Sequence, residues 1–297
     1  MINFYCGVDG GGTSCRARIT DKQGQQLGEA KTGSANILLG TDLAWSSINR
    51  AISEAAGQAG IPASQFDQIA VGLALAGAEQ RSAWHEFMKP PHVYGHVTLN
   101  TDAYGALMGA FNGDDGAILI AGTGSCGIVQ AAGECSVIGG REFPISDQGG
   151  GAIMGLRLIQ KTLLAADGLL TITPLAEEVL AHFKHDLDEI VTWSKSARPC
   201  DYGQFSPAIF AHANNSDELA VDLLSQTAAD IEMWLGGLRK LGANRVCLMG
   251  SIGERIVPWL KPPFQQLLVT PAGDAMDGAI LMAKGQHNLY AHEEATA

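Results

Sequence analysis

The first twenty residues have the pattern of two strands joined by a glycine-rich turn. An apolar run over residues 4–8 leads into Asp9-Gly10-Gly11-Gly12-Thr13-Ser14, after which apolar residues alternate with arginines over residues 15–19. Alternation with a period of two is typical of a strand that has one buried face. We therefore predict a β-hairpin, followed by a third strand over residues 27–31 that completes a meander.

The rest of the chain switches between strand and helix patterns. Residues 42–58 have the apolar period of an amphipathic helix, and the continuous apolar run 69–77 predicts a buried parallel strand. Next we expect strand 97–101, helix 103–111, a second hairpin over 117–129 and helix 152–166. The stretch 174–240 is mostly helical by period, with a break at 198–203 and a long helix from residue 219. The last expected elements are strand 245–249, a turn and a helix after it, and helix 274–284. This interleaving predicts an α/β protein.

Length and turn residues together predict two domains. The chain has 297 residues, which is above the usual size of a single domain. Residues 112–116, Asn-Gly-Asp-Asp-Gly, are rich in turn formers and contain no apolar side chain, so they are the best junction. We expect an N-terminal domain over 1–113 and a C-terminal domain over 114–297, with packing of the tail back on the first domain left open.

Both hairpin turns have the composition of phosphate-binding turns. Glycines allow positive φ and bring backbone N–H groups close to an anion, while hydroxyl groups add donors. Asp9 stands where a magnesium ion on a phosphate could be held, directly or through water. A tight hairpin without any ligand is the alternative for either turn alone. The residues concerned are Asp9, Gly10, Gly11, Gly12 and Thr13 in the first turn, and Gly122, Thr123, Gly124 and Ser125 in the second.

Further candidates follow the ends of predicted strands, where open α/β sheets bind ligands. One strand ends at Gly77, and the next ends at Asp102, which could be a catalytic base or only a helix N-cap. The glycine-dense loop 139–151 and the Gly250-Ser251 turn are typical of backbone that approaches a ligand closely.

Composition narrows the class of partner. The net charge of −12 argues against nucleic acid and against an anionic membrane surface, and no apolar run is long enough for a transmembrane helix. The six cysteines are scattered without a Cys-x-x-Cys pair, which predicts reduced thiols and a cytoplasmic protein. The pairs His92/His96 and His182/His185 lack further ligands at zinc spacing, so we expect no metal site there.

Four short motifs occur in the order found in the sugar kinase/actin/heat-shock-70 ATPase superfamily. Longer stretches over 73–80, 140–149, 201–207 and His287-Asn288-Leu289-Tyr290 resemble the N-acetylglucosamine kinase group, relatives of the BadF-type ATPases, and especially its bacterial glucosamine-specific members. This resemblance runs nearly from end to end. The four motifs are Asp9-Gly10-Gly11-Gly12-Thr13, Thr101-Asp102-Ala103, Gly122-Thr123-Gly124-Ser125 and Met249-Gly250-Ser251.

The resemblance implies two ribonuclease-H-like (actin-like ATPase) domains around an interdomain cleft, with ATP, Mg²⁺ and an amino sugar as ligands. It implies that both turns contact the phosphates and that Asp102 accepts the proton of the sugar's C6 hydroxyl. It also suggests a homodimer. It further implies that Gly250 and Ser251 border the adenosine, with Glu254 in the following turn, and that Asp9 contacts magnesium through water. It implies sugar contacts by Asn36, Asp102, Gly140 and Asp147, and Gly77 at its strand end is a further candidate for substrate binding.

One departure from the family bears on the substrate. Animal N-acetylglucosamine kinases have a tryptophan after the Gly-Gly pair, whereas here Gly139-Gly140 is followed by Arg141-Glu142. A free ammonium group favours a carboxylate partner, and an acetamide favours an apolar wall. We therefore expect Glu142 or Asp147 to face the C2 amine of glucosamine. The alternative is a surface ion pair between Arg141 and Glu142.

The resemblance implies phosphorylation of glucosamine at C6 as the reaction, with salvage of glucosamine from chitin breakdown as its setting. Three alternatives stay open. N-acetylglucosamine is the first, as a different substrate of the same chemistry. A BadF-type activator ATPase of a radical dehydratase would need cysteines that hold an iron–sulfur cluster, for which Cys126 and Cys135 are the candidates. A non-enzymatic sugar sensor is the third.

Overall fold

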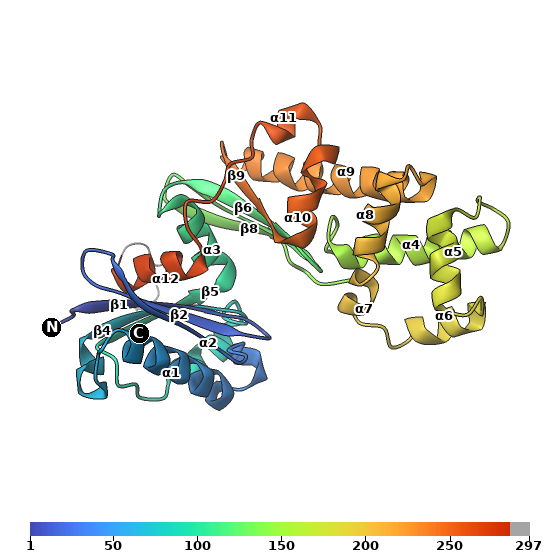
Figure 1. Ribbon diagram of the computed structural model, residues 1–297. Helices are drawn as coiled ribbons and strands as arrows, with labels where there is room; N and C mark the ends of the chain where they lie inside the picture. Colours follow the sequence, from blue (N-terminus) through green and yellow to red (C-terminus); the bar gives the residue numbers. More distant parts are fainter. Residues whose placement is uncertain (286–297) are drawn as a thin grey trace. The chain divides into compact units, whose positions relative to one another are not determined.

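The computed structural model describes residues 1–285 and divides into two compact units (Figure 1). Unit 1 comprises Met1–Gly116 together with the segment that begins at Thr270, and unit 2 comprises Ala117–Val269. The division therefore differs from the expected domains 1–113 and 114–297, because the final described helix belongs to unit 1. The motif His287–Tyr290 and the tail after it lie outside the described residues.

Unit 1 is built on a five-stranded sheet in the order β3-β2-β1-β4-β5. The first three strands form an antiparallel meander, and β1 pairs in parallel with β4, which pairs in parallel with β5. The expected strands are thus all present. The elements of unit 1 are β1 (Phe4–Gly10), β2 (Cys15–Thr20), β3 (Gln26–Thr32), α1 (Thr41–Gln58), β4 (Ile69–Leu75), α2 (Arg81–Met88), β5 (His96–Thr101), α3 (Asp102–Phe111) and α12 (Ala275–Ala283), with 3-10 turns η1 (Ile37–Leu39) and η2 (Ala63–Gln68).

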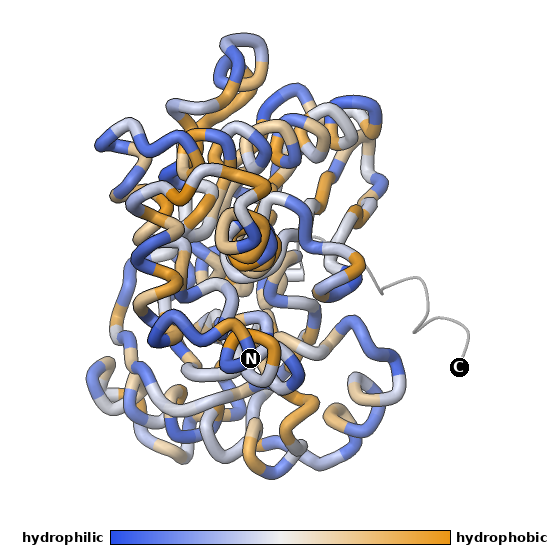
Figure 2. Tube along the Cα trace, turned by 90° about the vertical axis from the view of Figure 1, so that its right-hand side faces the viewer, coloured by the Kyte–Doolittle hydropathy of each residue, from blue (hydrophilic) through white to orange (hydrophobic). Residues whose placement is uncertain are grey.

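The two faces of this sheet are covered differently. Apolar side chains on one face, among them Val8, Ile19 and Leu73, form a fully buried core with Ile48 and Ile52 of α1. This core follows from the period-two pattern of β1 and β2 and from the apolar stripe of α1. Figure 2 shows that apolar and polar stretches are interspersed along the Cα trace.

On the other face, α12 lies directly on the backbone of β1 and β4. A β-carbon added to Gly7 would lie 2.0 Å from the carbonyl oxygen of Met276, and one on Gly72 would lie 1.8 Å from that of Ala279. Helix α3 approaches α12 just as closely, since a β-carbon on Gly109 would lie 1.8 Å from Asp274 O. Glycine is required at these positions because any side chain would push the helices away.

Unit 2 has a four-stranded sheet in the order β8-β7-β6-β9, with helices that bury an apolar core against it. The expected break at 198–203 is wrong: residues 199–203 form a short helix, because Pro199 suits a first helical turn and Asp201 accepts the N–H of Arg198 at 2.8 Å. Its elements are β6 (Gly116–Ala121), β7 (Ser125–Ala131), β8 (Glu134–Gly139), α4 (Gly151–Ala166), α5 (Pro174–His182), α6 (Leu187–Ser194), α7 (Pro199–Gly203), α8 (Ser206–Asn214), α9 (Glu218–Lys240), β9 (Val246–Met249), α10 (Gly250–Ile256), η3 (Val257–Trp259) and α11 (Pro262–Gln265).

Among the described residues, no helix combines the length and the apolar character that a membrane crossing requires.

Candidate active site

The first turn connects β1 to β2 and is held by the backbone, with the N–H of Gly11 donating to Ser14 O at 2.9 Å. The positive φ expected for its glycines is wrong, since Gly10, Gly11 and Gly12 all have ordinary negative or extended backbone. Packing requires glycine at position 10, where a β-carbon would lie 2.6 Å from Leu75. A β-carbon on Gly12 would meet nothing within 4 Å, so this side of the turn is open to a ligand.

Asp9 is held by an arginine across the hairpin. Asp9 and Arg16 are register partners on β1 and β2, and the Arg16 Nη2 and Nε atoms lie 2.6 and 3.2 Å from Asp9 Oδ2. Within residues 1–285 no donor contacts the other oxygen, Oδ1. A carboxylate oxygen is a hard ligand of the kind that Mg²⁺ or a magnesium-bound water prefers, so Asp9 fits the role expected for it.

Asn36 and Gly77 are brought together beside the first turn. The Asn36 Oδ1 atom accepts the N–H of Leu38 at 2.8 Å and so caps η1. Gly77 has a φ of 91°, and a β-carbon there would lie 2.9 Å from Asn36 Oδ1. The two loops are joined by a hydrogen bond of 3.1 Å from Ile37 N to Ala76 O. Both residues thus lie in one loop cluster beyond the carboxyl ends of β1 and β4.

Asp102 begins α3 at the carboxyl end of β5, but it is not the N-cap. Thr101 has that role, because its hydroxyl accepts the N–H of Tyr104 at 3.1 Å. Asp102 Oδ1 accepts the adjacent N–H of Ala103, at 2.7 Å. The sequence alone did not distinguish the two roles, and the structure leaves the carboxylate of Asp102 available for chemistry.

The electrostatic environment of Asp102 suits a proton acceptor. The pKa of Asp102 is raised, and burial of the carboxylate is the largest cause. The hydrogen bond from the Ala103 N–H lowers this pKa, whereas the negative charges of Glu79 and Asp9 raise it. A raised pKa makes a carboxylate a stronger base than a solvated aspartate. Because β1, β4 and β5 run in parallel, Asp9 near the end of β1 and Asp102 after β5 lie at the same edge of the sheet.

The second turn, in unit 2, is tied to the loop before α4. The N–H of Ser125 donates to Asp147 Oδ1 at 3.3 Å, and the Ser125 hydroxyl donates to Gln148 O at 2.8 Å. Gly151 N and Ala152 N, at the start of α4, donate to the carbonyl oxygens of Gly122 and Thr123 at 2.8 and 2.9 Å. The first N–H groups of α4 are therefore engaged by the turn, while the side chain of Thr123 is exposed.

The two acidic residues of the loop differ in availability. Asp147 is buried, has a φ of 70° and directs its carboxylate at the second turn. Glu142 is exposed, with a φ of 66°, and neither it nor Arg141 forms an ion pair within the part of the chain that the structure describes. Gly140, with a φ of 65°, donates its N–H to Ser125 O at 3.0 Å. Of the two candidates for an ammonium partner, Glu142 is the accessible one.

The third turn lies where β9 meets α10. Gly250 has a φ of 88°, and a β-carbon there would lie 2.5 Å from Ala121 O at the end of β6. Ser251 and Glu254 are both exposed on α10. In unit 2 the Gly250 turn thus packs against the end of β6, the strand that leads into the second turn.

The match to known families decides the assignment of the fold. Residues 6–283 match the BadF/BadG/BcrA/BcrD ATPase family. The chain belongs to this family. A curated relative, the glucosamine kinase GspK of Vibrio cholerae, is 60% identical over 290 residues, which is 97% of this chain and 99% of that protein.

Solved structures agree with the family. A Chromobacterium violaceum protein described as a candidate N-acetylglucosamine kinase is 33% identical, with a TM-score of 0.84 over 95% of this chain and 99% of its own. A ROK family glucokinase from Streptomyces griseus, solved with glucose and AMPPNP, is 17% identical, with a TM-score of 0.50 over 95% of this chain and 99% of its own, and supports the fold alone. The expected α/β sugar-kinase fold is confirmed.

Sequence reasoning missed Arg16. Its place on β2 opposite Asp9 gave the only available signal, because residues equally distant from a tight turn face each other across a hairpin.

Proposed function

We propose that the chain is an ATP-dependent glucosamine kinase. It transfers the γ-phosphoryl group of ATP to the C6 hydroxyl of glucosamine and yields glucosamine 6-phosphate and ADP. The observation that carries this proposal is the 60% identity to the Vibrio cholerae glucosamine kinase over 97% of the chain. The position of Asp102 and the accessible carboxylate of Glu142 support it from the structure.

In the proposed reaction, Asp102 is the general base. The C6 oxygen forms a bond to the γ-phosphorus as the bond from that phosphorus to the bridging oxygen of ADP breaks, and Asp102 takes the hydroxyl proton. Phosphoryl transfer needs positioning and charge neutralisation more than covalent chemistry, so a carboxylate that aims the hydroxyl suffices. General-base catalysis of this kind contributes about 10²–10⁴ in rate.

The two phosphate turns and the Gly250 turn would bind the nucleotide. Open space around Gly12 and Gly122 supports close approach of phosphate oxygens to the backbone. Thr13, Thr123 and Ser251 are exposed and can donate hydroxyl hydrogen bonds, and Glu254 lies on the same helix as Ser251. Ser125 has its N–H and its hydroxyl engaged, so its role is to support the turn.

Asp9 is the residue that would hold magnesium, through a bound water. Magnesium supplies neutralisation of the phosphate charge when bound. The side-chain oxygen Oδ1 of Asp9 is the atom that remains for this role, since Arg16 occupies Oδ2.

The sugar would be held by the Asn36–Gly77 loop cluster, Gly140 and Glu142. A carboxylate partner for the C2 ammonium group favours glucosamine over its acetylated form, in which this charge is absent. Asp147 has a different task in the structure: it supports the second turn. We therefore assign the ammonium contact to Glu142 alone.

N-acetylglucosamine kinase is the second candidate, because the structural relative from Chromobacterium violaceum carries that description at 33% identity. We also propose a cytoplasmic homodimer, which the family resemblance supports; light scattering of the purified protein measures the oligomer.

The test is a coupled ADP-release assay with MgATP on glucosamine, N-acetylglucosamine, glucose and no sugar. Turnover confined to glucosamine is the expected result. Equal turnover on the acetylated sugar would support the assignment as a sugar kinase but refute the role of Glu142 in sugar selection. ADP release that does not depend on the presence of a sugar would refute the assignment as a kinase.

A further inference from the structure

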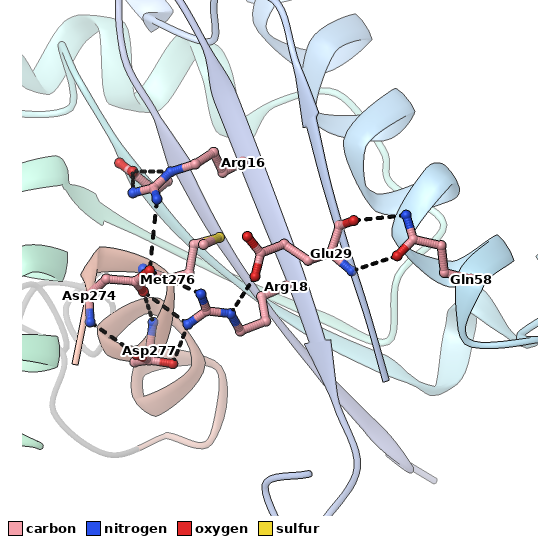
Figure 3. Close-up of polar contacts among 8 residues, drawn as sticks. Arg16, Arg18, Glu29, Gln58, Asp274, Met276 and Asp277 are labelled. Carbon is pink, nitrogen blue, oxygen red and sulfur yellow. Dashed lines mark hydrogen bonds and ion pairs between the residues drawn. The ribbon is translucent and has the colours of Figure 1, made fainter. Parts of the chain in front are cut away.

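A chain of ion pairs links the first phosphate turn to the start of α12 (Figure 3). Arg16 Nη2 lies 2.6 Å from Asp9 Oδ2, and Arg16 Nη1 lies 3.8 Å from Asp274 Oδ2. Arg18 continues the chain, with contacts of 3.0 Å to Asp274 and 2.6 Å to Asp277. All of these residues belong to unit 1.

The contact of Arg16 with Asp9 fixes the rotation of the carboxylate. Both the Nε and Nη2 atoms of Arg16 donate to the same oxygen, Oδ2, at 3.2 and 2.6 Å. The guanidinium is a planar, rigid fork, so two contacts on one oxygen define the direction of the carboxylate more narrowly than a single ammonium contact. The consequence is that Oδ1 is left for a ligand in a defined direction.

Arg16 also contacts Asp274, which is itself held in place by further contacts. Asp274 caps α12, since its Oδ1 atom accepts the N–H groups of Met276 and Asp277 at 3.0 and 3.1 Å. Arg18, whose side chain is only 16% exposed, binds the same carboxylate from the sheet. Asp274 is therefore held by a helix terminus and a half-buried arginine, and Arg16 lies between it and Asp9.

We propose that Arg16 is a positioning residue, which orients the Asp9 carboxylate so that Oδ1 faces the magnesium-bound water of MgATP. The inference rests on the proposed function. Partners that orient metal-binding carboxylates typically cost about 10- to 100-fold in metal affinity when they are removed. The chain Asp274–Arg16–Asp9 supplies this orientation from α12, more than 250 residues further along the sequence.

The test uses Arg16→Lys, which keeps the positive charge and removes the fork. ADP affinity is measured by calorimetry in EDTA and in excess MgCl2, without sugar, and the ratio of the two dissociation constants gives the magnesium enhancement. We expect Arg16→Lys to lose about 10- to 100-fold of this enhancement, with ADP affinity in EDTA unchanged. Arg50→Lys, in an exposed ion pair with Glu54 on α1, is the matched control and should retain it.

Three results would overturn the inference. One is a magnesium enhancement within threefold of wild type in Arg16→Lys. Another is equal weakening of ADP in EDTA and in magnesium, since Arg16 would then bind phosphate itself. The third comes from Asp274→Asn, which keeps the helix cap and removes the charge behind Arg16: a smaller loss in the same direction is expected, and no loss contradicts the chain of contacts. A wild-type protein that binds no MgADP would refute the proposed function. A wild-type protein that binds MgADP, together with an Arg16→Lys variant that keeps the full magnesium enhancement, would refute only the positioning role of Arg16.

Discussion

The carboxylate of Asp147 fills the space beside Gly124: a β-carbon on Gly124 would lie 2.6 Å from Asp147 Oδ2. This proximity explains a glycine whose backbone has no positive φ. The loop before α4 can therefore pack against the second turn because the Asp147 carboxylate occupies the space that a side chain at position 124 would need.

Gly124→Ala is therefore expected to destabilise unit 2, whereas Gly122→Ala is its matched control. A β-carbon on Gly122 would meet nothing within 4 Å. Overpacking a tight site costs about 1–3 kcal/mol, and an uncrowded substitution usually costs under about 0.5 kcal/mol. Urea denaturation of the two variants measures the difference, and equal midpoints would contradict the fit.

Asp102→Asn is expected to reduce kcat by about 10²–10⁴ with little change in the KM for ATP. Because burial raises the pKa of Asp102, the folded state disfavours the ionised form. Above that pKa this costs stability, so the thermal midpoint of the neutral asparagine variant should be no lower than that of wild type.

Asp42→Asn is the control for Asp102, since Asp42 is an exposed acidic residue in the first turn of α1. Its activity should match wild type. Retention of more than a tenth of wild-type kcat in Asp102→Asn would remove the general base from the mechanism.

The dependence of kcat/KM on pH should reflect the raised pKa of Asp102. The base is active when deprotonated, so kcat/KM falls as the pH drops through this pKa, at a higher pH than the value of about 3.9 for a solvated aspartate. Glu79→Gln removes one charge that raises it and should move the acid limb to lower pH. Glu86→Gln, in an exposed pair with Lys89, should not move it. A limb that stays in place in Glu79→Gln would show that another group controls it.

Glu142→Gln tests sugar selection. Loss of a charge-assisted hydrogen bond to the C2 ammonium group should lower kcat/KM for glucosamine by about 10- to 100-fold and leave N-acetylglucosamine turnover unchanged. Glu134→Gln, an exposed residue on β8 of the same unit, is the control. An unaltered preference between the two sugars would exclude Glu142 as the selector.

Local patterns predicted most of the elements of the fold. The alternation after Asp9 and the apolar run over 69–77 report burial directly, so the hairpin, β4 and α1 lie where they were expected. Contacts between elements that are far apart in the sequence could not be predicted in this way. No local signal assigns α12 to unit 1, because its contacts are with the backbone of Gly7 and Gly72, far away along the chain.

The candidate site shows the same limit. Glycines and hydroxyl groups identified both turns, but composition cannot tell which carboxylate is already engaged. Asp147 is occupied by Ser125, and Thr101 replaces Asp102 as the helix cap. Arg16 was missed because its importance comes from its partner across the hairpin. Each of these outcomes depends on hydrogen-bond geometry that the order of residues does not encode locally.

The return of α12 to the first sheet has a consequence for synthesis on the ribosome. All of unit 2, residues 117–269, emerges before Ala275–Ala283 becomes available. The strand faces at Gly7 and Gly72 therefore stay uncovered until all of unit 2 has been synthesised, so the unit whose synthesis begins first is completed after the other.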